Sequence, residues 1–301
     1  MWTKKDIPDQ SDKTVIVTGA NAGVGYETVL ALFEAGAHVI LACRSLENAN
    51  KAMSKIKEHP GTGTLEAGVL DLASLAAVKQ FADDFKTKHQ KLDVLINNAG
   101  VMIPPASKTV EGYELQFGVN FMGHFALTGH LYPLLKNTPG SRVVTVSSNA
   151  YLPGVINFDN LKSEQDYEPM REYRQSKLGN MLFSVELQRR IETTIDNVLS
   201  IAVQPGANKS DLSRHMDPVA YDAAVERLGG VMDPWQGALP SLYAATMPEV
   251  KGGDFYEPDQ QGGYKGFPRK GTSAPHAMEE AVAKKLWKMA EEATGLYYPQ
   301  A

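Results

Sequence analysis

Two tyrosines of this 301-residue chain are followed by a lysine four positions later, Tyr132 by Lys136 and Tyr173 by Lys177. On a helix, side chains four residues apart lie on one face at about 5–6 Å. A neighbouring ammonium group favours the phenolate and lowers the pKa of a tyrosine from its ordinary value of about 10. Either pair could therefore exchange a proton with a carbonyl or alcohol oxygen near neutral pH.

The two pairs differ in their surroundings along the chain. Pro133 follows the first tyrosine directly, and Tyr132–Lys136 closes a predicted helix just before an apolar run. The pair Tyr173–Lys177 instead begins a long predicted helix, Glu172–Ile191, after a polar insert. We therefore assign the proton transfer to the second pair. For the first pair we expect a partly buried aromatic ring beside a solvated lysine.

A glycine-rich turn follows the first apolar run, Thr14–Thr18, and precedes a segment with helical spacing of apolar residues. Glycine permits a sharp turn and close approach of the backbone to a pyrophosphate, which free N–H groups at a helix N-terminus bind. The spacing Gly-x3-Gly-x-Gly differs from the commoner dinucleotide fingerprint. The alternative is a tight strand–helix connection without a ligand. We expect a dinucleotide to bind here, through Gly19, Asn21, Gly23, Val24 and Gly25.

The residue after the second apolar run bears on the choice of dinucleotide. A carboxylate there would accept the ribose 2′-hydroxyl of NAD, but the run ends in Cys43 and Arg44. A guanidinium can hold a 2′-phosphate by charge-assisted hydrogen bonds, which favours NADP(H). The alternative is that Arg44 is a solvated loop cation. Asp71, next to Leu72 after the third run, could accept a hydrogen bond from adenine or cap the helix that begins near Ser74.

The elements that must position these residues alternate along the chain. Apolar runs typical of buried strands are separated by segments with helical spacing, which predicts a doubly wound parallel α/β sheet of about seven strands in one domain, residues 1–301. The predicted strands are Thr14–Thr18, His38–Cys43, Gly63–Leu70, Leu92–Ile96, Arg142–Ser147, Val198–Val203 and, more weakly, Gly253–Tyr256.

Segments outside this alternation are expected to flank the sheet. Residues 1–12 are predicted to form an N-terminal arm, and residues 257–301 a C-terminal extension. The stretch Lys251–Pro275 is rich in glycine, proline and charge, so we expect an extended surface tail after the last strand, followed by a docked helix at Ala277–Ala293. Residues 206–233 follow a strand end with apolar residues at near-helical spacing, which predicts a substrate lid. The apolar face of this lid would either pack on the core or roof a pocket.

Composition excludes several other classes of protein. The 30 Lys and Arg residues against 35 Asp and Glu give a net charge of −5, which argues against a nucleic-acid surface. A single cysteine, Cys43, excludes an intrachain disulfide and suits a reducing compartment. We find no apolar stretch long enough for a membrane span, and expect a cytoplasmic protein. His38 and His124 have no second ligand at metal-binding spacing, so no metal is expected.

Six motifs occur together in a fixed order. They are TGANAGVG at Thr18–Gly25, NNAG at Asn97–Gly100, Asn120 within VNFMGHF, VVTVSS ending at Ser148, YRQSK at Tyr173–Lys177 and QPG at Gln204–Gly206. In this order and spacing the chain resembles the short-chain dehydrogenase/reductase family, which has a single Rossmann-fold domain. The amino-acid sequences of several of these motifs resemble those of the retinol dehydrogenase-like branch of that family.

The resemblance implies a role for each matching residue of the reaction site. Tyr173 would be the general acid/base, and Lys177 would lower its pKa and bind the nicotinamide ribose. Ser148 would hydrogen-bond the substrate oxygen, although Ser147 remains an alternative because neighbouring strand residues face opposite ways. Asn120 would hold a water molecule in a proton relay to Lys177. Such enzymes are commonly homodimers or homotetramers.

The resemblance also implies further contacts with the cofactor. Asn98 would tie two strands together, and the backbone that follows it, Ala99 and Gly100, would line the cofactor. Pro205 and Gly206 would contact the nicotinamide end. Ser210 stands where the family usually has a threonine, and its hydroxyl can serve the same purpose.

We therefore expect an NADP(H)-dependent oxidoreductase that interconverts a carbonyl and an alcohol on a neutral, mostly apolar small molecule. Beyond Lys209, Arg171, Arg174 and Arg214, the segments after the fifth and sixth strands show no cluster of the fixed cations that a phosphorylated substrate would need. Two alternatives are reduction of a conjugated C=C bond and a dinucleotide sensor without catalysis. A sensor need not retain Asn120, Ser148, Tyr173 and Lys177 together, which favours the enzyme.

Overall fold

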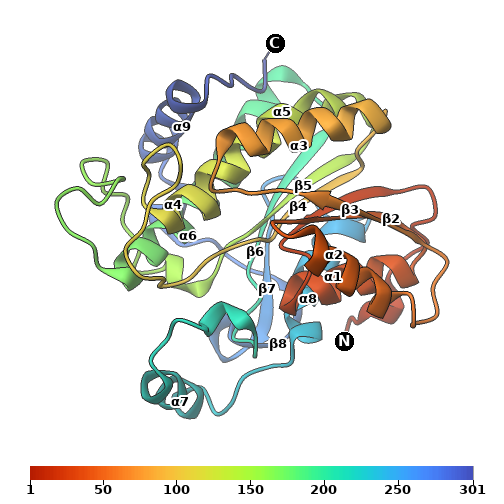
Figure 1. Cartoon of the computed structure of the whole chain (residues 1–301), viewed down its shortest axis with the longest axis horizontal. Helices are drawn as coiled ribbons and strands as arrows, with labels where there is room; N and C mark the ends of the chain where they lie inside the picture. Colours follow the sequence, from red (N-terminus) through yellow and green to blue (C-terminus); the bar gives the residue numbers. More distant parts are fainter. Residues whose placement is uncertain (301) are drawn as a thin grey trace.

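The computed structural model describes residues 1–300, which form one eight-stranded sheet covered by helices on both faces (Figure 1). The strand order is β3-β2-β1-β4-β5-β6-β7-β8, and every neighbouring pair is parallel except β7 and β8. The strands are β1 Thr14–Thr18, β2 His38–Cys43, β3 Thr64–Val69, β4 Val94–Asn97, β5 Ser141–Val146, β6 Val198–Val203, β7 Phe255–Gln260 and β8 Lys265–Lys270.

The helices separate into two layers with a hydrophobic core on each side of the sheet. Helices α1, α2 and α8 share one core, and α3, α5, α6 and α9 share the other. This arrangement confirms the doubly wound α/β fold. The helices are α1 Gly23–Glu34, α2 Leu46–Ile56, α3 Leu75–Lys88, α4 Leu115–Phe117, α5 Gly123–Asn137, α6 Pro169–Thr194, α7 Pro218–Arg227, α8 Pro234–Thr246 and α9 Glu280–Thr294. Shorter helical turns are η1 Lys4–Asp6, η2 Gly118–Met122, η3 Asn149–Tyr151, η4 Asp211–Ser213, η5 Gln261–Gly263 and η6 Pro275–Met278.

The β7–β8 hairpin corrects one expectation. We expected a short last strand followed by an extended surface tail at 251–275, but this segment forms β7 and the antiparallel edge strand β8. Pro258 and Pro268 lie opposite each other in the hairpin, and charged residues fill the edge strand. Proline and charge are tolerated at a sheet edge, and they hide the apolar pattern by which strands are recognised.

The ends of the chain pack on opposite faces of the sheet. Trp2 of the N-terminal arm lies edge-to-face against Tyr243 of α8, with ring centroids 5.2 Å apart. In the C-terminal extension α9 buries Trp287 in a stack against Phe183 of α6. The helix predicted at Ala277–Ala293 is α9, which begins three residues later, at Glu280. Within residues 1–300, no helix has the length and apolar character needed to cross a membrane.

Candidate active site

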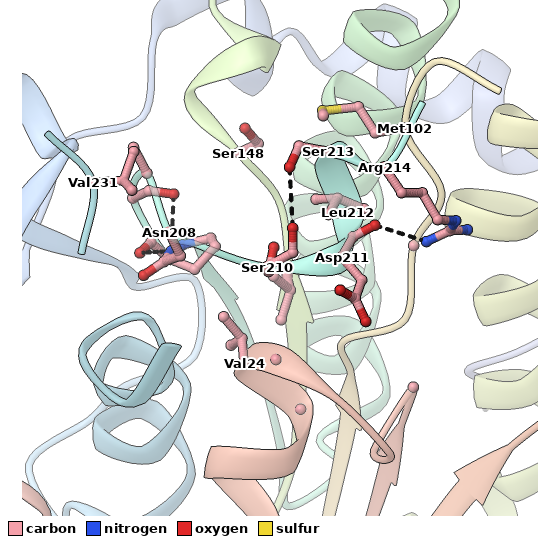
Figure 2. A pocket seen from close by; sticks show the side chains of 18 of the residues that line it. Val24, Met102, Ser148, Asn208, Ser210, Asp211, Leu212, Ser213, Arg214 and Val231 are labelled. Carbon is pink, nitrogen blue, oxygen red and sulfur yellow. Dashed lines mark hydrogen bonds between the residues drawn. The ribbon is translucent and has the colours of Figure 1, made fainter. Parts of the chain in front are cut away.

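A cavity of about 440 Å³ opens at the carboxyl ends of the central strands, between the glycine turn and the segment after β6 (Figure 2). Most residues predicted for the site line it. They are Gly19, Asn21, Gly23, Val24, Gly25, Asn98, Ala99, Gly100, Ser148, Tyr173, Lys177, Pro205, Gly206 and Ser210. Its size is that of a small-molecule pocket. Arg44, Asp71, Leu72 and Asn120 lie beyond its lining.

The glycine turn has no room for side chains at two of its positions. Gly19 adopts a φ of +65°, which favours glycine, and a Cβ on Gly25 would lie 2.4 Å from the Gly19 carbonyl oxygen. Helix α1 begins at Gly23, and its N-cap residue, Ala22, makes no side-chain capping bond. The first N–H groups of α1 are therefore free to bind an anion, as the pyrophosphate of a dinucleotide requires.

Thr18 joins the glycine turn to the end of β4. Its Oγ1 accepts hydrogen bonds from the backbone N–H groups of Asn98 and Ala99, both at 2.9 Å. Asn98 in turn donates through Nδ2 to the Thr18 carbonyl oxygen at 2.8 Å. The strand-tying contact that the resemblance implied for Asn98 is thus present.

A buried histidine extends this network to Asn120. The Nδ1 atom of His124 lies 2.9 Å from the Asn120 carbonyl oxygen, and Nε2 lies 2.9 Å from Thr18 Oγ1. Burial lowers the pKa of His124 to about 4, so the ring is neutral. A carbonyl only accepts, so Nδ1 carries the proton and Nε2 accepts from Thr18. The sequence pattern predicts no such contact for His124, because sequence spacing does not reveal a contact between β1 and α5.

Asn120 sits in the π-helical turn η2, a geometry found often at functional sites. Its Oδ1 accepts from Val101 N at 2.8 Å, and its Nδ2 donates to Val101 O at 3.0 Å and Ser176 Oγ at 2.9 Å. A Cβ on Gly100 would lie 3.3 Å from Asn120 Oδ1 and 3.5 Å from Lys177 Nζ. The side chains of Asn120 and Lys177 therefore both lie close to Gly100, which lines the cavity. The water relay proposed for Asn120 stays a prediction.

Helix α6 places Tyr173 over the end of β5. The helix begins at Pro169, and the Glu168 side chain caps it by accepting from Met170 N at 3.0 Å and from Arg171 N. One turn later the Tyr173 side chain is buried, and Tyr173 and Ser148 both line the cavity. Burial raises the pKa of Tyr173 to about 12, although the neighbouring Ser148 hydroxyl lowers it in part.

This direction corrects the prediction that Lys177 holds the pKa of Tyr173 below its ordinary value. Lys177 is itself buried, which lowers its pKa to about 8. Its Nζ lies 5.7 Å from the centre of the Tyr173 ring and donates to Val146 O at 3.3 Å. The loss of hydration at both groups therefore outweighs their mutual attraction. No ion-pair partner of Lys177 is found in residues 1–300.

The two serines after β5 have different partners. Ser147 Oγ donates to the Lys177 carbonyl oxygen at 2.8 Å, and this hydroxyl is buried. Ser148 Oγ accepts from Ala150 N at 3.2 Å, and Ser148 lines the cavity together with Tyr173. Ser147 therefore ties β5 to α6, whereas the Ser148 hydroxyl lies beside the tyrosine at the cavity.

The β7–β8 hairpin supports this end of the cavity from behind. Gln204 Nε2 donates to Gly263 O at 2.7 Å, and Ala207 N donates to Tyr264 O at 2.9 Å. Next to Ser148, Asn149 Nδ2 donates to Gly262 O at 3.0 Å. The segment we expected to be a surface tail therefore holds both the turn after β6 and the turn that carries Ser148.

The predicted lid segment, residues 206–233, leaves the body of the molecule and returns at one point (Figure 1). Backbone hydrogen bonds join Met232 to Ala207 at 2.8 Å and to Lys209 at 2.9 Å. These bonds hold the two ends of the segment 206–233 together. Helix α7 has no buried residue. Six apolar residues of the segment 206–233 line the cavity, namely Leu212, Met216, Tyr221, Val225, Leu228 and Val231. That this segment acts as a substrate lid stays a prediction.

The adenine side of the site is more open. Gly19 N donates to Ala42 O at 2.9 Å, so the end of β2 lies against the glycine turn, and Arg44 follows it with an exposed side chain. Asp71 Oδ1 accepts from Ala73 N at 3.0 Å, whereas Ser74 caps α3. Leu72 is buried against α5.

Comparison with known proteins assigns the chain to a class. The family model for short chain dehydrogenases matches residues 13–219. The chain therefore belongs to the short-chain dehydrogenase/reductase family, oxidoreductases that bind a nicotinamide dinucleotide.

Individual relatives narrow the branch to one that resembles retinol dehydrogenases. Human retinol dehydrogenase 14 is 40% identical, over 94% of this chain and 87% of its own length. Human polyprenol dehydrogenase is 38% identical, over 96% of this chain and 86% of its own length. Among solved structures, an uncharacterised protein from Mycobacterium paratuberculosis is 36% identical and covers 99% of each chain with a TM-score of 0.83.

Proposed function

We propose that the protein is an NADP(H)-dependent oxidoreductase that interconverts a carbonyl and an alcohol on a neutral, mostly apolar small molecule, with Tyr173 as general acid/base. One observation carries this proposal. The side chains of Tyr173 and Ser148 line the same cavity as the glycine turn and the free N-terminus of α1.

In the reducing direction, the nicotinamide would supply a hydride to the carbonyl carbon. Tyr173 keeps its hydroxyl proton at neutral pH, because burial raises its pKa to about 12, and it donates that proton to the carbonyl oxygen. Ser148 holds the same oxygen by a hydrogen bond. The Lys177 ammonium group stabilises the phenolate that remains, and oxidation of the alcohol reverses these steps.

Arg44 is the residue that we assign to the 2′-phosphate of NADP(H). Its side chain is exposed beside the glycine turn, and it has no ion-pair partner in residues 1–300. We expect NADPH to bind at least about tenfold more tightly than NADH, which corresponds to about 1.4 kcal/mol. Arg44→Ala should remove most of this preference, whereas Lys51→Ala, which removes an exposed cation of α2, should not. Calorimetric titration measures both, and equal binding of the two cofactors by the parent protein would contradict the assignment.

An apolar substrate is favoured by the residues that border the cavity opposite the glycine turn. Met102, Leu212, Met216 and Leu228 present apolar side chains there, and Arg214 is the cation among them. The retinol and polyprenol of the relatives' names are apolar alcohols, which agrees with this chemistry.

A kinetic panel tests the substrate class. NADPH oxidation should be measured with neutral aldehydes and ketones of increasing alkyl or ring size, small charged keto acids and conjugated enones. We expect kcat/KM to rise with apolar size among the neutral carbonyls. A preference for charged keto acids would overturn the apolar substrate, and reduction of the enones at the C=C bond would overturn the carbonyl reaction.

A further inference from the structure

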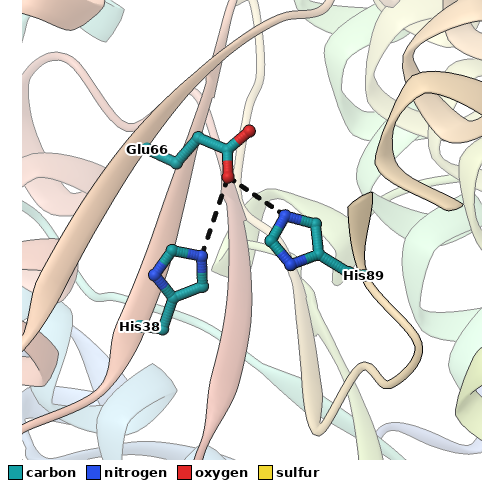
Figure 3. Close-up of side chains that lie close together, drawn as sticks. All are labelled: His38, Glu66 and His89. Atoms are coloured by element: carbon teal, nitrogen blue, oxygen red, sulfur yellow. Dashed lines mark hydrogen bonds and ion pairs between the residues drawn. The ribbon is translucent and has the colours of Figure 1, made fainter. Parts of the chain in front are cut away.

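Three side chains from separate elements meet on the outer part of the sheet, away from the cavity (Figure 3). His38 begins β2, Glu66 lies in the edge strand β3, and His89 follows the end of α3. The carboxylate lies between the two imidazole rings. All three side chains are partly exposed, so an ion from solution can reach them.

We propose that His38, Glu66 and His89 form a binding site for a divalent cation of the zinc class. Two imidazole nitrogens and one carboxylate oxygen are ligands that Zn²⁺ accepts, with a water molecule able to complete four-coordination. The site is independent of the proposed oxidoreductase reaction.

The spacing of the ligand atoms fits such an ion. Ligands at about 2.0–2.1 Å from a tetrahedral zinc ion lie about 3.3 Å from one another. Glu66 Oε2 is 3.0 Å from His89 Nε2 and 3.7 Å from His38 Nε2, which brackets this distance. The three ligand atoms all lie within 4.8 Å of one another, so small rotations of the side chains suffice to coordinate one ion.

Neighbouring residues already orient two of the ligands. Thr64 Oγ1 lies 2.6 Å from His38 Nδ1, and with an ion bound a hydrogen bond from Nδ1–H to this hydroxyl would leave the lone pair of Nε2 for the ion. Lys88 Nζ lies 2.8 Å from Glu66 Oε1, so the ion pair occupies one carboxylate oxygen while Oε2 faces the histidines. Partners of this kind fix ligand orientation in metal sites and strengthen binding.

The position of the site indicates a structural role. His38 is at the start of β2, whereas the cavity lies at the carboxyl ends of the strands. An ion here would join β2, the edge strand β3 and the end of α3. Because it binds the folded chain, it should raise the melting temperature without changing turnover.

Titration of the chelator-treated full-length protein with ZnCl₂ tests the proposal by calorimetry and thermal unfolding. We expect one site that raises Tm, and loss of both signals in His89→Ala and in Glu66→Gln. Thr64→Val should weaken binding about tenfold or more. His59→Ala removes an exposed histidine outside the cluster and should leave binding and the rise in Tm unchanged.

Two results would overturn the proposal. One is Zn²⁺ binding of equal stoichiometry and affinity in the parent protein and His89→Ala, which would place the ion elsewhere. The other is absence of any 1:1 binding or rise in Tm in the parent protein, which would leave the cluster as an ion pair between Glu66 and its cationic neighbours. Neither result depends on the oxidoreductase assay.

Discussion

The two Tyr-x3-Lys pairs share a spacing and an exposed fraction but differ in chemistry. Tyr132 and Tyr173 are both 4% exposed. The Tyr132 hydroxyl donates to Asp196 Oδ2 at 2.9 Å, and Lys136 Nζ pairs with the other oxygen of that carboxylate at 3.0 Å. Tyr173 instead lines a cavity together with Ser148, and Lys177 is buried without a carboxylate partner.

This difference shows what turns the motif into a candidate for proton transfer. Burial and the Asp196 carboxylate both raise the pKa of Tyr132, so its proton is committed to a structural hydrogen bond. Lys136 is 42% exposed and already neutralised by the same aspartate. At Tyr173 the charge of Lys177 is uncompensated and is therefore available to a phenolate. The partners of the pair, more than its burial, separate the two cases.

The largest expected effect comes from removing each hydroxyl in turn. If Tyr173 is the proton donor, Tyr173→Phe should lower kcat/KM for carbonyl reduction by about 10²–10⁴, the usual worth of general acid catalysis. Cofactor should still bind, because the glycine turn is unaffected. Tyr132→Phe is the matched control and should leave turnover nearly unchanged. Steady-state kinetics with calorimetric titration of NADPH measures both, and the opposite pattern would reverse the assignment.

A second substitution pair sharpens the comparison at the partner of the tyrosine. Ser148→Ala should lower kcat by about 10²–10³, as for loss of a hydrogen-bond donor to a developing oxyanion. Ser147→Ala removes a bond to the Lys177 backbone and should reduce stability more than turnover. Parallel measurement of kcat and thermal unfolding separates these outcomes. A larger loss of kcat in Ser147→Ala would exchange the roles of the serines.

The alternation of apolar runs was sufficient to predict the sheet, because parallel strands covered on both faces must be continuously apolar. The glycine turn, Tyr173 and Lys177 were found because each depends on local spacing. The start of β7 was predicted at Gly253–Tyr256, but its continuation and β8 were missed, since Pro258 and Pro268 interrupt the apolar pattern of these strands. Contacts between distant segments, such as His124 with Thr18, leave no local pattern at all.

The pKa values could not be predicted from spacing for a similar reason. The four-residue interval indicates that Lys177 lies near Tyr173, but it does not show how far each group is removed from water. In the folded chain burial has the largest effect on both groups. It raises the pKa of Tyr173 and lowers that of Lys177, so it favours the neutral form of each side chain. The Ser147–Ser148 alternative likewise depended on the direction of each hydroxyl, which the fold decides.

A smaller effect is expected from pH. Burial lowers the pKa of Lys177 to about 8, so its ammonium form is present below that pH and is lost above it. We expect kcat/KM for carbonyl reduction to be level up to about pH 8 and then to fall, by up to about tenfold per pH unit. Lys177→Met should have low activity and lack this limb. A parent profile that stays level to pH 10 would show that the charge of Lys177 is not required.

The smallest effect concerns stability at the structural pair. Tyr132→Phe removes a hydrogen bond to the Asp196 carboxylate, and such bonds to charged groups contribute about 1.5–3 kcal/mol. Lys136 still pairs with Asp196, so we expect the lower end of that range and a fall in Tm of a few degrees. Burial would raise the pKa of Asp196, but Lys136, Tyr132 and Thr194 together lower it below 3.8. The stabilisation from these interactions is therefore present above pH 3.8 and is lost as the pH falls through the pKa of Asp196 in the folded chain.

Urea unfolding at pH 7 and pH 3 measures the difference in free energy of unfolding between Tyr132→Phe and the parent protein, and this difference should be smaller at pH 3. A loss of stability that is the same at both pH values would show that the Tyr132 ring packing, and not its bond to the carboxylate, stabilises this region.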